Sequence, residues 1–388
     1  MKQIVNIISR ITVLCILPCL VCCSCDSTST LPPPSTGGGP GTTETDMTAL
    51  YEYVRSYQTS YIRSLQLPSG AIKDNGTESS KITPYFANFA ALALLTEPTE
   101  QNVSAVKKYI SWYLSKLNGT STQFKGNEIA GSVYDYFAPN ETCKGEYDSV
   151  DSYAATFLEL ASRFADISGG CKSWLMGHKD KLSLVLSAMI KTIDCASNTL
   201  PGENTNDCLS IAHYGHAVKY LMDNSEVNMG LKAAMRLKSA GLIETSQDLD
   251  ALLSGNKSGI LGLYNESDGN YDYAKGHKSE WNVKFFYPSA PAQLYPCIFG
   301  VVPADDPRSK TVYEKFNSTY PEWSTGTTYS DYPWTMIAYA AAAMGDAGRV
   351  NAYLTHIYGL NVKGEQKERW YDAEAGALLL AIEKVSKK

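Results

Sequence analysis

The sequence is poor in charge and has no excess of basic residues. Only 19% of its 388 residues are charged, and the formal net charge is -6. Proteins that bind nucleic acid carry a basic patch or stripe, so we expect no nucleic-acid partner. The chain also lacks a phosphate-binding glycine loop, a dinucleotide fingerprint and a nucleophile elbow. We therefore predict no cofactor and none of the enzyme classes that depend on these motifs.

Cysteine is scarce after residue 25. The five cysteines beyond that point form no Cys-x-x-Cys pair: Cys143, Cys171, Cys195, Cys208 and Cys297. Zinc sites usually depend on such pairs, so we predict no metal site. Cys195 and Cys208 flank a loop that contains Pro201 and Gly202, and they are the best candidates for a disulfide.

The apolar run near the N-terminus is too short to span a membrane comfortably. It extends from Ile11 to Val21, whereas a transmembrane helix needs about 20 apolar residues. Lys2 and Arg10 place positive charge before it, which is typical of an export signal. We therefore expect residues 1–25 to be a signal peptide and the protein to be secreted or held at the cell surface.

Three cysteines follow this run, as Cys22, Cys23 and Cys25, in a pattern that resembles a bacterial lipoprotein signal. Lipid would be attached to Cys23 or Cys25, although neither position fits the usual lipobox, and a simple secretory signal is the alternative. Residues 26–45 are rich in Ser, Thr, Pro and Gly, which predicts a flexible linker. We expect contact with a membrane only through such an N-terminal lipid.

From residue 46 to residue 388, apolar residues recur at helical spacing with little sign of strands. The spacing predicts helices over residues 50–65, 85–95, 103–117, 152–167, 172–195, 211–223, 227–240, 249–263, 290–301, 309–320, 333–345, 349–358 and 371–385. A helical solenoid should repeat every 30 to 50 residues or so, and no such repeat is found. The sequence therefore predicts a single all-α domain, an (α/α)6 toroid, which we expect to be a monomer.

Aromatic residues are plentiful, with 26 tyrosines among them. A tyrosine ring can stack on a sugar while its hydroxyl forms hydrogen bonds, although most tyrosines simply pack between helices. Acids beside aromatic rings recur where the predicted helices start. This recurrence favours a carbohydrate substrate.

Asp148 and Asp151 are the first candidates for catalysis. They lie three residues apart at the start of the predicted helix 152–167, so they share a face of its first turn. Glycoside hydrolysis uses one carboxylic acid to protonate the leaving oxygen and one carboxylate to activate water or attack the sugar. Both residues could instead cap the helix, because helix N-termini favour negative charge.

Glu226 is the predicted second carboxylate, in a segment that joins two predicted helices. In the alternative interpretation, Asp223 or Asn224 caps the following helix and Glu226 completes the local hydrogen bonds. Asp135 lies between two tyrosines and is an auxiliary acid candidate, although an acid in a loop is often only a turn residue. The predicted substrate-binding residues are Tyr134, Tyr153, Asp223, Asn224, Glu280, Trp281, Tyr287, Asp331, Trp334 and Glu374.

Five motifs follow one another along the chain: QLPSGAI at 66–72, KITPYFAN at 81–88, DSVDSYAAT at 148–156, LMDNSEV at 221–227 and FYPSA at 286–290. Taken in this order, they resemble a secreted lipoprotein branch of the six-hairpin glycosidase superfamily. The resemblance implies a carbohydrate ligand, because the superfamily contains inverting glycosidases, uronyl hydrolases, polysaccharide lyases and sugar epimerases. Some of its members place a catalytic base near the chain end, where Glu374 lies.

We therefore predict a glycoside hydrolase that acts on a poly- or oligosaccharide with inversion. A polysaccharide lyase or sugar epimerase is the alternative on the same fold, in which His213 or His216 would move a proton together with a tyrosine. A third possibility is a glycan-binding lipoprotein without catalytic activity.

Overall fold

The computed structural model describes residues 44–387 except 196–197, 199, 201–203 and 365–368. The predicted signal peptide, Cys23, Cys25 and nearly all of the predicted linker lie outside the described residues. The described residues belong to one compact unit that is mostly helical, as the sequence predicts. No helix within them has both the length and the apolar character that crossing a membrane requires.

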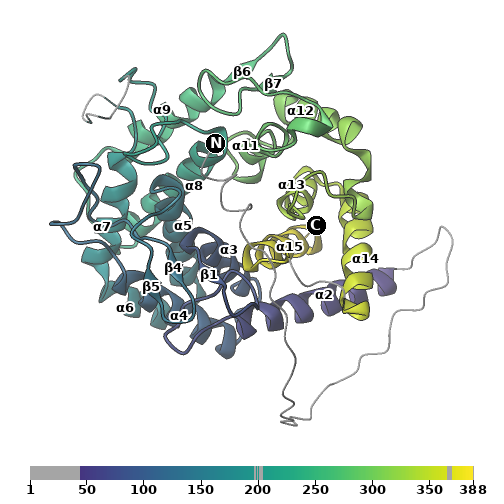
Figure 1. Cartoon of the computed structure of the whole chain (residues 1–388), viewed down its shortest axis with the longest axis horizontal. Coiled ribbons are helices and arrows are strands. Elements are labelled where there is room, and N and C mark those ends of the chain that lie inside the picture. The colour runs from purple at the N-terminus through teal and green to yellow at the C-terminus, as the bar shows by residue number, and fades with distance from the viewer. Residues whose placement is uncertain (1–43, 196–197, 199, 201–203, 365–368, 388) are drawn as a thin grey trace, which may run out of the picture. The chain divides into compact units, whose positions relative to one another are not determined.

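A closed circle of helices forms the centre of this unit (Figure 1). Each helix of the circle contacts the next, and the last returns to the first. In order they are α3 (Pro84–Leu94), α5 (Asp151–Ile167), α8 (Leu221–Ser239), α11 (Tyr295–Ile298), α13 (Met336–Met344) and α15 (Asp372–Ser386).

An outer helix precedes each inner helix along the chain. The outer helices are α2 (Glu44–Ser64), α4 (Glu100–Ser115), α7 (Lys179–Lys191), α9 (Leu249–Leu261), α12 (Pro307–Thr319) and α14 (Ala347–Lys363), with α6 (Gly169–Met176) packed beside α5. Because each outer helix carries the chain back, the inner helices run in the same direction and their N-termini lie at one end. This is the predicted (α/α)6 toroid.

Small residues let the inner helices approach one another closely. A Cβ at Gly230 of α8 would lie 2.7 Å from the Cβ of Ala155 of α5. A Cβ at Gly376 of α15 would lie 2.8 Å from the carbonyl oxygen of Phe89 of α3. These close contacts require glycine, because any side chain would push the helices apart.

Some predicted helix boundaries are wrong. The predicted helix 211–223 is a loop as far as Tyr220, because His213 and His216 pair across a tight turn, and α8 begins only at Leu221. The predicted helix 290–301 consists of α10 (Ser289–Ala292) and α11, and the prolines in these two segments remove backbone donors. The predicted helix 172–195 is divided between α6 and α7.

Short antiparallel strands lie in the connecting loops. Strands β1 (Lys81–Ile82), β4 (Tyr136–Phe137) and β5 (Thr142–Cys143) form one small sheet. Two hairpins are formed by β2 (Gln123–Phe124) with β3 (Asn127–Glu128), and by β6 (Tyr264–Asn265) with β7 (Asn270–Tyr271).

The predicted disulfide between Cys195 and Cys208, both described, is wrong. Cys208 is a free thiol. Its sulfur lies against α9, where a Cβ at Gly255 would come within 2.6 Å of the Cys208 Sγ.

Candidate active site

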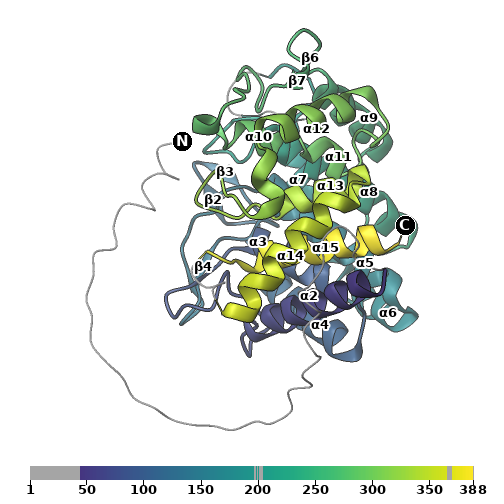
Figure 2. The ribbon, with the colours of Figure 1, turned by 90° about the vertical axis from the view of Figure 1, so that its right-hand side faces the viewer.

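The N-terminal ends of the inner helices carry most of the predicted site residues. Asp151 begins α5, Asp223 and Glu226 lie in the first turns of α8, and Glu374 lies in the first turn of α15. The loops that carry β2 to β4 and helix α10 lie at the same end of the unit (Figure 2). Residues far apart in the sequence therefore meet here.

Glu226 is a buried carboxyl at the base of this site. The residue is only 1% exposed, and its Oε1 accepts a hydrogen bond of 2.5 Å from the hydroxyl of Tyr85. Burial raises the pKa of Glu226 to about 8, although the bond from Tyr85 acts in the opposite direction. Tyr295 of α11 is also buried, and the nearby Glu226 charge contributes to raising its pKa. Glu226 is therefore mostly protonated at pH 7.

Asp151 lies deeper still and is fully buried. Its carboxyl accepts hydrogen bonds from Ser149 Oγ at 2.6 Å, Ser210 Oγ at 2.5 Å and the Ser152 amide at 2.8 Å. Burial raises its pKa to about 7. With no exposed surface, Asp151 lies behind the site and cannot touch a substrate without a rearrangement.

Asn224 is the partner that holds Ser210 in place. Its Oδ1 accepts from the Ser210 amide at 2.6 Å, and its Nδ2 donates to the carbonyls of Ser210 and Tyr220. Asn256 of α9 adds a further hydrogen bond to the same Oδ1. Asn224 is fully buried with its polar atoms satisfied, so its role is to support the loop before α8 rather than to bind a sugar.

Asp148 and Asp223 are the carboxylates at the surface of the site. Asp148 is exposed and Asp223 is partly exposed, and no described side chain donates a hydrogen bond to either carboxylate. Desolvation nevertheless raises the pKa of both. The Asp148 charge also acts on Asp223, so the two acids lie near each other at the end where the inner helices begin. The surface around these two acids is called the cleft below.

The environments of these two acids separate their pKa values. Desolvation and then the charges of Asp151 and Glu226 raise the pKa of Asp223 well above its usual range. The pKa of Asp148 is also raised by desolvation, but the neighbouring His216 lowers it. Such a pair of differing acids is typical of a site that performs acid and base catalysis.

An aromatic surface adjoins the two carboxylates. Tyr287 is 44% exposed, and its ring stacks on Trp334 with centroids 5.2 Å apart. Partial desolvation is the largest cause that raises the pKa of Tyr287, and the charges of Asp148 and Asp223 are the next. This ring therefore lies near both acids. A sugar ring could stack here beside the carboxylates.

Glu374 fixes the position of Trp334. Its Oε2 accepts from the Thr335 amide at 2.7 Å, and its Oε1 accepts from the Trp334 amide at 3.2 Å. The carboxyl thus holds the segment that leads into α13, and desolvation raises its pKa. Its hydrogen bonds give it a supporting role.

Three further tyrosines that the sequence did not indicate have rings or hydroxyls at the site: Tyr85, Tyr220 and Tyr295. Tyr220 ends the loop before α8, and its hydroxyl is 2.9 Å from His216 Nε2. The charges of Asp223 and Asp148 help to raise the pKa of Tyr220, after burial, to about 12. Their place in the sequence could have indicated them, because Tyr85 and Tyr220 lie next to the first residues of the inner helices α3 and α8.

Asp135, Tyr153 and Tyr134 lie beside the site rather than on its surface. Asp135 is buried, and its Oδ1 accepts from the Tyr153 hydroxyl at 2.9 Å while Lys144 pairs with Oδ2 at 3.4 Å. Tyr153 is itself buried, and Tyr134 stacks on Tyr147 at 5.2 Å. These contacts are structural.

Glu280, Trp281 and Asp331 are not brought into contact with the acids. The Lys315 ammonium of outer helix α12 lies 5.0 Å from the centre of the Trp281 ring, and Glu280 is exposed next to it. Asp331 is exposed and forms an ion pair with Arg369 at 2.6 Å. Trp281 therefore packs against the outer layer.

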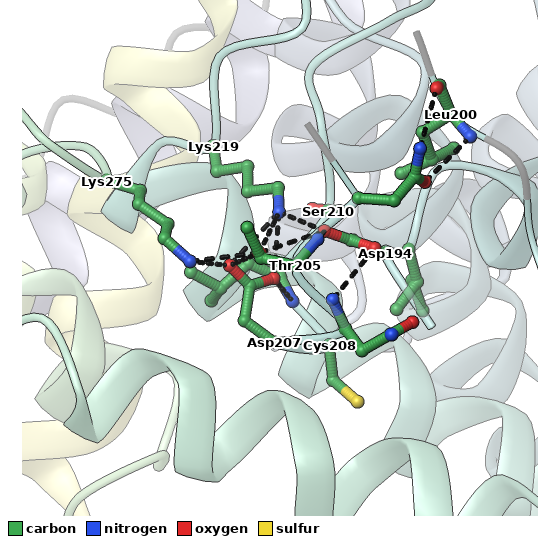
Figure 3. A network of polar contacts seen from close by, with 12 residues as sticks. Asp194, Leu200, Thr205, Asp207, Cys208, Ser210, Lys219 and Lys275 are labelled. Carbon is green, nitrogen blue, oxygen red and sulfur yellow. Dashed lines mark hydrogen bonds and ion pairs between the residues drawn. The ribbon is translucent and has the colours of Figure 1, made fainter. Parts of the chain in front are cut away.

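A buried lysine anchors the loop that leads into α8 (Figure 3). Lys219 Nζ contacts Asp194 Oδ2 at 2.5 Å and Asp207 Oδ1 at 2.9 Å, and Lys275 pairs with the same Asp207. These contacts lower the pKa of Asp207 to about 2 despite its partial desolvation. These ion pairs hold in place the loop that brings Ser210 to Asp151 and His216 to Asp148.

Comparisons with known proteins agree with this architecture. No family model and no curated protein matches the chain. Among solved structures, a wild-type glycosidase is 12% identical, with 89% of this chain and 99% of that chain covered at a TM-score of 0.57. A substituted form of a glycosidase in complex with glucose gives the same values.

A third solved structure is a GH63 mannosylglycerate hydrolase from Thermus thermophilus in complex with glucose. It is 10% identical, with 85% of this chain and 99% of that chain covered at a TM-score of 0.55. At such low identity the likeness establishes the shared (α/α)6 fold. Within the described residues, no group of three or more His, Cys, Asp or Glu side chains is placed to hold a metal ion.

Proposed function

We propose that this protein is a glycoside hydrolase of the six-hairpin superfamily, acting outside the cytoplasm on a poly- or oligosaccharide. The observation that carries the proposal is the pair Asp148 and Asp223. Both acids are accessible, accept no hydrogen bond from a described side chain, and lie near each other beside a stacked aromatic pair. The glycosidases of the same fold support this interpretation.

Asp223 is the proposed general acid. Desolvation, followed by any charge on the nearby Asp151 and Glu226, raises its pKa well above the usual range and so favours the protonated form. It would give its proton to the glycosidic oxygen as the bond to the anomeric carbon breaks. In this proposal Asp151 and Glu226 are buried neighbours of Asp223 and do not act on the substrate.

Asp148 is the proposed general base. Its exposure gives water access to the carboxylate, and no neighbouring carboxylate contributes to raising its pKa, in contrast to Asp223. The carboxylate would take a proton from the water that attacks the anomeric carbon. Asp148 precedes α5 and Asp223 lies on α8, so the two acids reach the cleft from separate elements, and in this proposal the attacking water lies between Asp148 and the sugar. We therefore propose inversion, which requires carboxyl groups about 6.5–9.5 Å apart.

The test is a screen of the purified protein against a panel of glycans, followed by NMR of the first product anomer. We expect release of reducing sugar with an inverted anomeric configuration, and a loss of about 10²–10⁴-fold in rate for Asp148→Asn and Asp223→Asn. Full activity in both variants would refute the assigned roles. Glycan binding without any product would favour a non-catalytic glycan-binding lipoprotein.

The contact between His216 and Tyr220 favours a second candidate, a polysaccharide lyase or sugar epimerase. A histidine and a tyrosine 2.9 Å apart beside Asp148 could move a proton at a sugar carbon. A lyase would create a C=C bond, so ultraviolet absorbance of the product separates it from a hydrolase.

A further inference from the structure

We propose that the sugar at the reacting position carries no negative charge, so that this cleft takes neutral or amino sugars and rejects uronic acids. This inference rests on the proposed function, because it concerns the substrate of the same cleft. The evidence for it is the set of charged groups around Asp148 and Asp223 and the ion pairs that the nearby cations already form.

Within the part of the chain that the structure describes, the carboxyl groups of the cleft have no cationic partner. No lysine or arginine among the described residues donates a hydrogen bond or forms an ion pair with Asp148, Asp223 or Glu226. Glu374, the other acid on this side, uses its oxygens on the segment that begins α13. A sugar carboxylate would therefore meet acids and no compensating charge.

Lys144 and Arg369, cations near the site, are already paired. Lys144 influences Asp148, but its Nζ is 3.4 Å from Asp135 Oδ2 and 3.0 Å from Glu146 Oε1, and its side chain is only 9% exposed. Arg369 Nη1 pairs with Asp331. Freeing either one for a ligand would leave a carboxylate without its partner.

His216 does not supply a positive charge either. Desolvation lowers its pKa, and its Nε2 is taken by the Tyr220 hydroxyl. The remaining polar groups near the acids are tyrosine hydroxyls, such as that of Tyr287. Hydroxyls and aromatic faces match the hydroxyls and carbon faces of an uncharged sugar.

The same arrangement opposes the lyase candidate. A lyase acting on a uronate must neutralise the carboxylate of the sugar to make the neighbouring proton acidic. The described side chains around Asp148 and Asp223 offer no free cation for that task, so the contact between His216 and Tyr220 has a better explanation as support for the base.

The experiment compares methyl glycosides of the same ring that differ in the charge of one substituent. The methyl glycosides of glucose, glucosamine and glucuronic acid, with the matching galactose and mannose series, are titrated into the purified protein and followed by ligand-observed NMR. We expect the neutral member of at least one series to bind, the amino member to bind at least as well, and the uronate of that series to bind at least tenfold more weakly. A uronate that binds as well as its neutral partner, or a failure of all neutral sugars to bind, would overturn the inference.

Charge variants show whether the cleft acids cause the difference. Asp148→Asn should reduce the difference in binding affinity between the neutral sugar and the uronate. Glu383→Gln removes the same charge from the last turns of α15, away from the N-terminal end of this helix. It should leave the difference in binding affinity unchanged. An equal effect of both variants would contradict the assignment to the cleft.

Failure of this inference is distinguishable from failure of the proposed function. A protein that prefers neutral sugars but hydrolyses no glycan would refute the hydrolase and keep the charge preference. A protein that hydrolyses a uronide would keep the hydrolase and refute the charge preference.

Discussion

The Tyr85 hydroxyl donates a hydrogen bond of 2.5 Å to Glu226 Oε1 and thereby joins inner helix α3 to inner helix α8. Asp223 lies three residues before Glu226, on the same face of α8. Because a charge on Glu226 would raise the pKa of Asp223, the ionisation of each acid opposes that of the other. The contact therefore links the stability of the ring to the chemistry proposed for the cleft.

Replacing Glu226 with Gln should change how stability depends on pH. The pKa of Glu226 is raised to about 8, so the folded state binds a proton that the unfolded state releases above its ordinary value near 4.5. Wild-type stability should then fall as pH rises from about 5 to 8, by up to about 1.4 kcal/mol per pH unit. Glu226→Gln should flatten this fall, measured by urea unfolding at several pH values.

The matched control for this prediction is Glu383→Gln. Arg163 and Lys387 lower the pKa of Glu383, so its contribution is lost only as pH falls below its ordinary range. This variant should keep the wild-type slope between pH 5 and 8. A wild-type slope in Glu226→Gln would show that Glu226 is ionised in the folded protein.

Asp223→Asn and Asp148→Asn should respond differently to the leaving group. If Asp223 is the acid, Asp223→Asn should recover most of its rate on an activated aryl glycoside, because a good leaving group needs no proton. Asp148→Asn should remain slow on both kinds of substrate, since water activation is lost in each. The ratio of kcat/KM on activated and ordinary substrates measures this, and the opposite pattern would exchange the two roles.

The sequence predicted the architecture well because helical periodicity is a local signal. Apolar spacing located the long helices, and α5 begins at Asp151, one residue from the predicted start. The loop over residues 211–220 was predicted to be helical because the pattern there continues at helical spacing, while the turn between His213 and His216 prevents a helix. Tertiary contacts, not local spacing, decide such segments.

The sequence predicted that the site lies at the N-terminal ends of helices, but not which side chains there reach the cleft. Asp148 and Asp151 are three residues apart, yet one is exposed and the other is fully buried. Trp281 and Trp334 both adjoin acids in the sequence, yet Trp281 packs under Lys315 of the outer layer. Which side chain reaches the cleft depends on the layer and direction of its element, and neighbouring residues in the sequence do not encode this.

Tyr287→Leu should weaken substrate binding with little effect on chemistry. The exposed ring stacks on Trp334 and lies near both acids, so its loss removes an aromatic platform worth about 1 kcal/mol. We expect KM to rise about fivefold with kcat nearly unchanged. Trp281→Leu is the control and should leave KM unchanged, although it removes a larger ring. Equal effects of the two variants would mean that Tyr287 does not line the cleft.

Lys219→Met should destabilise the protein and slow catalysis together. The variant leaves the buried Asp194 without its ion-pair partner and loosens the loop that carries Ser210 and Tyr220. Breaking a buried pair on one side costs about 3–5 kcal/mol, measured by urea unfolding at pH 7. Lys278→Met, whose contact with Asp268 is exposed at 3.8 Å, should cost less than about 0.5 kcal/mol.

The pH dependence of the Lys219→Met effect identifies its electrostatic part. The pKa of Asp207 is lowered to about 2, so its stabilising contribution is complete above about pH 4 and disappears as pH falls through 2. The difference in stability between wild type and Lys219→Met should therefore shrink on acidification across this range. A difference that stays constant with pH would mean that Lys219 stabilises the loop through packing of its aliphatic stem, and kcat of the variant would then report only on loop position.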